Sequence, residues 1–176
     1  MTSDYEEEAL QRLGEGNSGA AALATAVDVE DPIRVLDLEQ VISVKSGSNL
    51  QDVINILNEK HIGCVTVLNA DGDTIGIFTE RDVLRKVVGR GLDFSKEIVD
   101  KYMTRDPDIL SENDPIAYAL NKMSDGGYRH VPITRAGKVK FMLSIRDIVD
   151  LISITHRKKV LNLPPNPKQE TTQYGG

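Results

Sequence analysis

The sequence predicts an α/β (α+β) protein built from two tandem β-α-β-β-α units, and an internal repeat is the main reason. Residues 76–83 (GIFTERDV) return 65 positions later as residues 141–148 (FMLSIRDI), with a hydroxyl residue, an arginine and an aspartate in register. Apolar residues with helical spacing also recur 66 positions apart, first over 50–57 and then over 116–123. Short apolar runs bounded by turn-forming residues accompany both copies. Self-similarity at a fixed offset indicates one structural unit present twice.

The repeat divides the chain into five segments. We expect a flexible acidic leader over 1–32, a first unit over 33–90, a linker over 91–97, a second unit over 98–155 and a C-terminal tail over 156–176. The leader is rich in acids and glycines, which makes it a poor packed element. The tail contains three prolines, which prevent a helix from continuing.

Each element of the first unit follows from a local pattern. Residues 41–44 predict a short strand, and a helix is expected to start at Ser48, because Gln51 completes a capping-box pattern. Strands are expected over 64–68 and 74–78, joined by a turn at 69–73. The apolar residues of the first helix are Leu50, Val53, Ile54 and Leu57, and those of the closing helix are Val83, Leu84, Val87 and Val88.

The second unit repeats this order. Asp114 is expected to cap its first helix, with Pro115 at the first helical position. Strands are expected over 131–134 and 138–143, joined by a turn one residue shorter than its counterpart. The apolar residues of the two helices are Ile116, Ala119, Leu120 and Met123, followed by Ile148, Val149 and Ile152.

Composition narrows the class of protein. Hydrophobic residues make up 40% of the chain and charged residues 27%, as in a soluble globular protein. The net charge of −6 comes from the leader, so the rest of the chain is nearly neutral and has no basic stripe for nucleic acid. No apolar stretch is long enough to span a membrane, and a single cysteine excludes internal disulfides. We therefore expect a cytoplasmic protein that binds neither nucleic acid nor membrane.

The repeated polar residues lie where a strand gives way to a helix. Helix N-termini attract phosphate, a hydroxyl adds a donor there, and an arginine fork matches phosphate oxygens. An aspartate one turn later can accept hydrogen bonds from the two hydroxyls of a ribose. The two sets are Thr79, Arg81 and Asp82 in the first unit, and Ser144, Arg146 and Asp147 in the second. The alternative is purely structural, because a hydroxyl residue with an acid three positions later is also a capping box.

The chain resembles the cystathionine β-synthase (CBS) domain family in its element order and in the Gly-h-x-Thr-x-x-Asp pattern around Thr79, where h is apolar. Residues 129–133 (RHVPI) and 144–147 (SIRD) are typical of that family. The resemblance covers about 33–155 and implies a tandem CBS pair, or Bateman module. It further implies two units packed through their sheets as a pseudo-two-fold pair, clefts that bind adenosine derivatives, and dimerisation.

An adenine ring needs an apolar slot with backbone groups that can contact its edge. Four segments are candidates for that slot. The residues expected there are Ile42, Gly63, Cys64, Ile109, His130, Val131 and Pro132. Arg129 is a further candidate nucleotide-binding residue. The two halves differ as candidates, because Gly76 corresponds to Phe141 and Thr66 to Pro132. The sequence leaves open which cleft binds a ligand.

The leading functional hypothesis is a regulatory module that binds an adenine nucleotide (AMP, ADP or ATP), NAD or S-adenosylmethionine and relays its presence to an unidentified partner protein. No cofactor is required, and a homodimer is expected. The alternative is a dimeric interaction scaffold with vestigial clefts, and a third possibility is an enzyme that acts on the nucleotide. We expect no enzyme, because the sequence shows no activated nucleophile, Walker-type loop or metal-ligand spacing among its three histidines.

Overall fold

The computed structural model describes residues 27–155. The chain divides into two compact units, each described by itself. One unit, Val29–Asp147, contains both β-sheets. The other consists of Met1–Asp28 and Ile148–Gly176, of which the structure describes 27–28 and 148–155. Most of the predicted leader and all of the predicted tail therefore lie outside the described residues.

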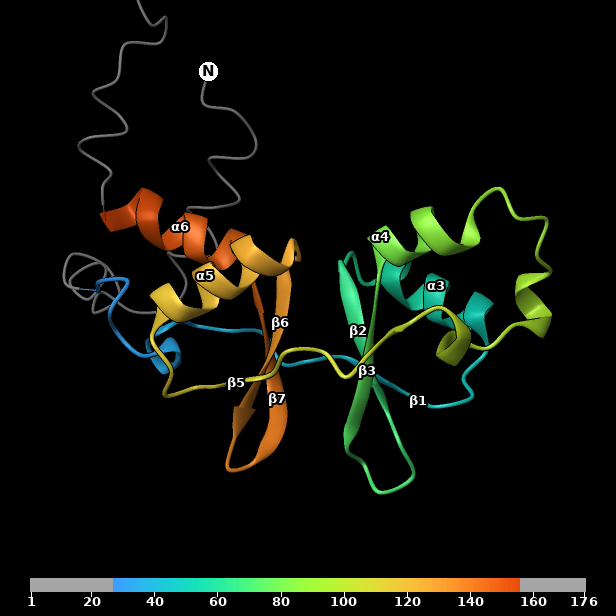
Figure 1. The fold of residues 1–176 in the computed structure, drawn as a ribbon, viewed down its shortest axis with the longest axis horizontal. Helices are drawn as coiled ribbons and strands as arrows, with labels where there is room; N and C mark the ends of the chain where they lie inside the picture. Colours follow the sequence, from blue (N-terminus) through green and yellow to red (C-terminus); the bar gives the residue numbers. More distant parts are fainter. Residues whose placement is uncertain (1–26, 156–176) are drawn as a thin grey trace, which may run out of the picture. The chain divides into compact units, whose positions relative to one another are not determined.

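The first sheet has four strands in the order β1-β2-β3-β4 (Figure 1). Strand β1 is parallel to β2, and the other neighbours are antiparallel. The strands are β1 (Ser43–Lys45), β2 (Cys64–Leu68), β3 (Thr74–Thr79) and β4 (Thr104–Arg105). In the turn between β2 and β3, the Asn69 side chain accepts hydrogen bonds from the backbone N–H groups of Asp71 and Asp73, as expected for a turn residue.

Helices complete the first half. Helix α3 spans Leu50–Glu59, and α4 (Glu80–Asp82) runs directly into a π-helical turn, η2 (Val83–Val87). Short 3₁₀ turns follow at η3 (Phe94–Lys96) and η4 (Val99–Lys101). The core of this half joins buried side chains of α3, β2 and β3, including Leu50, Val53, Leu57, Val65, Val67 and Phe78.

The second half has a three-stranded sheet in the order β5-β6-β7, with the same parallel and antiparallel neighbours. Its elements are β5 (Leu110–Ser111), α5 (Ile116–Gly126), β6 (His130–Arg135), β7 (Lys138–Ser144) and α6 (Ile145–Thr155). Ala136 and Gly137 form the β6–β7 turn with positive φ angles of 52° and 75°. The predicted β-α-β-β-α order is thus confirmed in both halves.

Each half also receives an edge segment from the chain that precedes the other half. Strand β4 pairs with β3 of the first half. Conversely, the residues just after the leader form hydrogen bonds with the second half, and they include a 3₁₀ turn, η1 (Ile33–Val35). The N–H of Ile33 donates to the carbonyl oxygen of Asp114 at 2.9 Å, and the N–H of Val41 donates to that of Lys140 at 3.0 Å. The sequence boundary predicted at residue 33 therefore does not coincide with a boundary between sheets.

Two predicted helix caps are wrong by one residue. Asn49, rather than Ser48, caps α3, and its side chain accepts from the Gln51 N–H. Helix α5 begins after Pro115, which occupies the cap position itself. Asp114 instead accepts a hydrogen bond from the Ser111 N–H at 2.8 Å, so its carboxylate closes the preceding turn and does not cap the helix.

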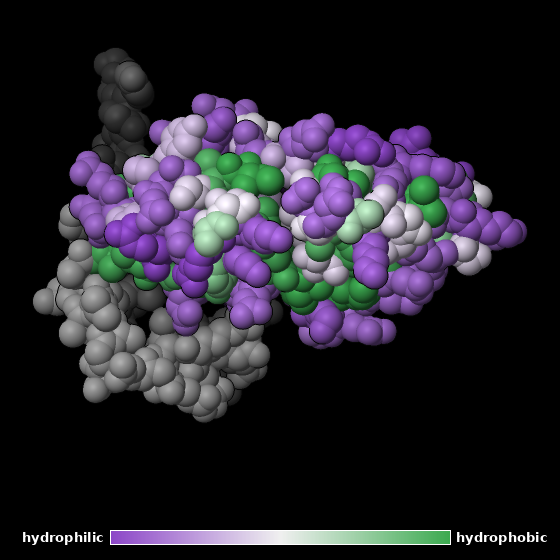
Figure 2. Space-filling model, turned by 90° about the horizontal axis from the view of Figure 1, so that it is seen from below, coloured by the Kyte–Doolittle hydropathy of each residue, from purple (hydrophilic) through white to green (hydrophobic). Residues whose placement is uncertain are grey.

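The closing helices bury only part of their apolar residues. Val87 is buried in η2, whereas Leu84 is 70% and Val88 54% exposed. In α6, Ile148 is buried and Val149 is 51% exposed. On the face shown in Figure 2, hydrophilic residues predominate and are interrupted by smaller hydrophobic areas. Among residues 27–155, the structure contains no helix long and apolar enough to cross a membrane.

Candidate functional site

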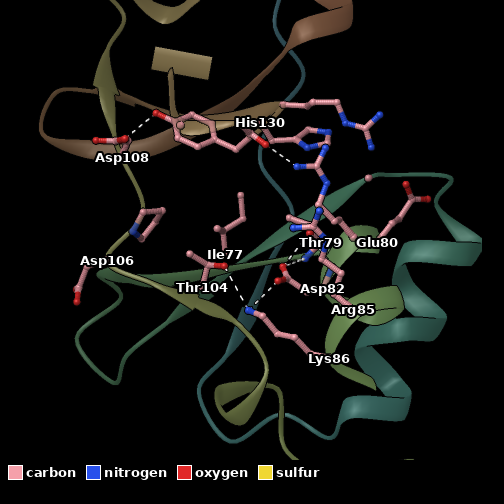
Figure 3. Close-up of a pocket in the computed structure, with 17 residues that line it drawn as sticks. Ile77, Thr79, Glu80, Asp82, Arg85, Lys86, Thr104, Asp106, Asp108 and His130 are labelled. Atoms are coloured by element: carbon pink, nitrogen blue, oxygen red, sulfur yellow. Dashed lines mark hydrogen bonds and ion pairs between the residues drawn. The ribbon is translucent and has the colours of Figure 1, made fainter. Parts of the chain in front are cut away.

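A pocket of about 490 Å³ opens beside the junction between β3 and α4, and we call it the Thr79 pocket (Figure 3). Four stretches of chain build it: the turn before β2, the end of β3 with α4 and η2, the segment around β4, and the segment from the end of α5 into β6. Its lining residues are Gly63, Ile77, Thr79, Glu80, Arg81, Asp82, Arg85, Lys86, Thr104, Asp106, Pro107, Asp108, Gly126, Gly127, Tyr128, Arg129 and His130. Residues from both sheet-forming halves therefore share one cavity.

Thr79 and Asp82 form a complete capping box at the pocket wall. The Asp82 Oδ2 atom accepts from the backbone N–H of Thr79 at 3.0 Å and from its hydroxyl at 2.8 Å. The Asp82 N–H donates to Thr79 Oγ1 at 3.1 Å. The structural interpretation of this motif is therefore confirmed, and it leaves the Oδ1 atom of Asp82 as the oxygen available to other partners.

Lys86 pairs with this Oδ1 atom of Asp82. Its ammonium group lies 2.8 Å from Asp82 Oδ1 and donates to the carbonyl oxygen of Tyr102 at 2.8 Å. The Thr104 hydroxyl is 3.5 Å from the same nitrogen. Lys86 thus connects η2 to the segment that enters β4 (Figure 3).

Tyr128 and Asp108 form another wall of the pocket. The Tyr128 hydroxyl donates to Asp108 Oδ2 at 2.6 Å, and Lys122 lies 3.4 Å from the other carboxylate oxygen. The Tyr128 hydrogen bond is the main cause that lowers the pKa of Asp108, whereas burial raises the pKa of Tyr128. A Cβ at Gly126 would lie 2.1 Å from the Tyr128 ring, so the glycine makes room for it.

His130 lies half-buried beside Gly63, where an added Cβ would come within 2.8 Å of two atoms of the imidazole ring. Burial lowers the pKa of His130, and the neighbouring Arg129 lowers it further. The Arg81 guanidinium donates to the Gly127 carbonyl, which ties α4 to the start of the segment that carries His130.

The pocket gathers part of the predicted site. The predicted residues that line it are Gly63, Thr79, Arg81, Asp82, Arg129 and His130. The remaining predicted residues lie outside its lining, and these are Ile42, Cys64, Ile109, Val131, Pro132, Ser144, Arg146 and Asp147. Ile109 instead lines a second cavity of about 470 Å³ near the two hairpin turns. Of the residues predicted for an adenine slot, Gly63 and His130 share the Thr79 pocket, and Ile109 lines the second cavity.

Several predicted residues that do not line the Thr79 pocket have contacts or burial that the structure defines. Val131 and Pro132 are buried in β6, and burial raises the pKa of the Cys64 thiol to about 12, which keeps it protonated and unreactive. Asp147 Oδ2 accepts from the Ser144 N–H at 2.7 Å and from its hydroxyl at 2.9 Å, repeating the hydrogen bonds of Asp82. Phe141 packs under the Arg135 guanidinium, 4.4 Å from the ring centre.

Several pocket residues were missed from the sequence. Lys86 and Arg85 look like solvated helix positions, and Thr104 and Tyr128 belong to segments that carry no motif of their own. A signal for Lys86 was nevertheless present, because a lysine four residues after an aspartate on a helix can pair with it. Within residues 27–155, no group of three or more His, Cys, Asp or Glu side chains is arranged to hold a metal ion.

Two similar sheets, each followed by a helix that begins with the same Thr/Ser–Asp hydrogen bonds, define a tandem repeat of one α/β domain. The model of the CBS domain family matches residues 29–89 and 96–154. The chain therefore belongs to the CBS domain family and contains two copies of the domain.

Individual relatives agree with this assignment. An uncharacterised 17.7 kDa protein of Acidianus ambivalens is 30% identical over 66% of this chain and 70% of its own length. The match covers only 44% of a Methanocaldococcus jannaschii relative and 24% of an Arabidopsis thaliana CBS domain-containing protein. A crystal structure of an uncharacterised Pyrococcus horikoshii protein is 28% identical, with a TM-score of 0.64 over 70% of this chain and 93% of that chain.

Two more distant structures share the fold and were solved with ligands. A Pyrobaculum aerophilum CBS domain protein complexed with AMP is 23% identical, with a TM-score of 0.61 over 70% of this chain and 97% of that one. The CBS domain pair of protein MJ0100, in complex with 5′-methylthioadenosine and S-adenosylmethionine, is 20% identical, with a TM-score of 0.61 over 69% of this chain and 95% of that chain.

Proposed function

We propose that this protein is a regulatory module that binds an adenine nucleotide or another adenosyl ligand in the Thr79 pocket and relays its presence to a partner protein. The observation that carries the proposal is the pocket itself, where a hydroxyl, a carboxylate and several cations converge in a CBS pair. Its volume of about 490 Å³ lies in the usual range for small-molecule sites. The ligands named for the Pyrobaculum aerophilum and MJ0100 structures are of the same adenosyl class.

The lining residues suit the separate parts of such a ligand. Asp82 Oδ1 is an acceptor for a ribose hydroxyl, since Oδ2 already serves the capping box. Arg81, Arg85 and Lys86 supply positive charge from α4 and η2. The Tyr128 ring and the Ile77 side chain offer apolar surface to a base.

The relay requires no covalent chemistry. The pocket is lined by both sheet-forming halves, so a ligand that contacts both favours the arrangement in which those contacts coexist. A partner that binds one arrangement better than another then senses the ligand. We accordingly propose that the protein has no enzymatic turnover of its own.

Titration tests the proposal. We expect at least one of AMP, ADP, ATP, NAD and S-adenosylmethionine to raise the melting temperature, because ligand at 100 times Kd stabilises the native state by about 2.7 kcal/mol. D82A should weaken that ligand, and D93A is the matched control, because Asp93 forms a similar turn cap and lysine pair outside the pocket. If none of the five compounds changes the melting temperature at millimolar concentration, the proposal fails.

We also propose that the protein forms a homodimer, and exposed apolar side chains in η2 and directly after it support this. Leu84 is 70% and Val88 54% exposed in the structure. They lie four residues apart, and neighbouring exposed apolar residues can form part of a protein–protein contact surface. Sedimentation velocity of the parent and of L84E/V88E tests the idea, with a dimer expected for the parent and a monomer for the variant. A dimer that binds none of the compounds would favour the alternative function, an interaction scaffold. Binding at the Ser144 position and a cytoplasmic location stay predictions from the sequence.

A further inference from the structure

In the Thr79 pocket, Lys86 forms an ion pair with Asp82, the carboxylate that we propose binds a ribose hydroxyl. We propose that Lys86 makes this pocket select phosphorylated nucleosides: a ribose hydroxyl takes its place on Asp82 Oδ1, and the released ammonium group binds the phosphate. The inference rests on the proposed function and names both the ligand class and the residue that determines it. Four features of the structure lead to it.

The first feature is the saturation of the Asp82 carboxylate. Asp82 is buried, 8% exposed, and its Oδ2 atom already accepts two hydrogen bonds from Thr79. Its Oδ1 atom is 2.8 Å from the Lys86 ammonium. A ligand hydroxyl that donates to Asp82 must therefore share or displace this lysine contact.

The second feature is the freedom of Lys86 to move once displaced. Its side chain is 39% exposed, whereas that of Asp82 is 12% exposed, so the lysine can swing within the pocket while the carboxylate is held by its cap. The remaining contacts of its ammonium group are with the Tyr102 carbonyl at 2.8 Å and the Thr104 hydroxyl at 3.5 Å, which carry no formal charge. A phosphate offers that ammonium a stronger, charge-assisted partner.

The third feature is the distribution of charge along the wall. Arg81, Arg85 and Lys86 lie within six consecutive residues of the pocket lining. The acidic residues are placed differently: Asp108 is engaged by Tyr128 and Lys122. Figure 3 shows the carboxylates of Glu80 and Asp106 directed away from Lys86. The whole lining holds four basic and four acidic side chains, but the three cations within residues 81–86 outnumber Asp82 there. This stretch favours a phosphate over the sulfonium cation of S-adenosylmethionine.

The fourth feature is the link from Lys86 to the rest of the molecule. Tyr102 lies just before β4, the edge strand of the first sheet, and Thr104 is the first residue of that strand. When Lys86 turns to a phosphate, this segment loses the hydrogen bond that the Tyr102 carbonyl accepts from Lys86. Binding of a phosphorylated ligand thereby changes how η2 is held against the segment that joins the two halves.

Isothermal titration of the full chain with adenosine, AMP and S-adenosylmethionine tests the proposal. We expect the parent to bind AMP more tightly than either of the other compounds. K86M should weaken AMP by about tenfold or more, because it removes a charge-assisted contact, without weakening adenosine. K96M is the matched control: the Lys96–Asp93 pair is also 2.8 Å long but lies outside the pocket, so this variant should bind like the parent.

Two further variants keep the test decisive. K86Q retains a hydrogen-bond donor for the Tyr102 carbonyl but not the charge, and it replaces K86M if that variant fails to fold. K86R restores the charge and should recover much of the preference for AMP. If the parent binds AMP and the K86M or K86Q variant keeps the same ratio of AMP to adenosine affinity, the inference is wrong while the proposed function stands. Tighter binding of S-adenosylmethionine than of AMP would refute the ligand class, and a parent that binds no adenosyl compound would refute both proposals.

Discussion

Replacing Asp82 with alanine should destabilise the empty protein, apart from any effect on ligand binding. The change removes two hydrogen bonds from Thr79 to a carboxylate that is 8% exposed, together with the Lys86 ion pair. The N-cap bond from the backbone N–H of residue 82 to Thr79 Oγ1 remains, so the loss is confined to the contacts of the carboxylate. Hydrogen bonds to charged groups contribute about 1.5–3 kcal/mol. Because water can enter the pocket and solvate the groups left behind, we expect a net loss of about 2 kcal/mol in the free energy of unfolding.

Urea unfolding followed by circular dichroism measures this loss directly. In thermal unfolding it should appear as a decrease of about 4–8 °C in melting temperature for a chain of this size. D93A is the control, because Asp93 is exposed and its removal should cost no more than about 0.5 kcal/mol. The reasoning is refuted if D82A costs no more than D93A, since the capping box would then contribute nothing beyond an exposed turn.

Three further predictions concern neighbouring features. In G76A the new methyl group would lie 2.4 Å from Met103 Sδ and 3.1 Å from the Thr104 carbonyl oxygen. This overpacking should lower the free energy of unfolding by about 1–3 kcal/mol in urea titrations. Cys64 should resist a thiol reagent at pH 8 in the native protein and react fully in urea, because burial raises its pKa to about 12; rapid native labelling would contradict this. His130 has a pKa below its ordinary value of 6.5, so the unfolded chain binds more protons near that pH and stability should fall on acidification from pH 7.5. H130Q should show a shallower decrease between pH 7.5 and 5.5 than the parent.

Strands and turns were predictable because their signals are local. Residues 64–68 and 74–78 are rich in β-branched residues and flank a turn whose asparagine bonds to its own backbone, and the structure places β2 and β3 there. The helix caps were harder, because Ser48 and Asn49 are both good cap residues and the choice depends on where the chain turns. Asn49 was selected by a contact distant in sequence, since its amide also donates to the carbonyl of Ser95.

The candidate site was less predictable, because strands that are buried on both faces give no alternation. In β2 the side chains of Cys64, Val65, Thr66 and Val67 are all buried, so periodicity cannot indicate which of them faces a cavity. Thr66, which we expected to distinguish the two clefts, instead bonds to the Ser43 hydroxyl at 2.7 Å. The pocket also depends on residues near 104 and 128, which only the folded chain brings to Thr79.

The π-helical turn η2 is another feature that was not predicted from the sequence. Its characteristic bond runs from the Val88 N–H to the Val83 carbonyl at 2.9 Å, five residues apart. Helical spacing groups Val83, Leu84, Val87 and Val88 on one stripe, yet Leu84 and Val88 are exposed. Lys86, on the same turn, lies beside Asp82 in the pocket.

The exchanged edge segments have a consequence for synthesis on the ribosome. Strand β3 lacks its neighbour β4 until residues 104–105 have emerged, so the first sheet stays incomplete while the connecting chain is being made. The segment before β1 waits longer, since Gln40 pairs with Phe141 in β7. An unpaired edge is a template for pairing with other chains, which makes the interval between these events the period of greatest risk of misassembly. Neither CBS copy can reach its final hydrogen bonding before most of the other has been translated.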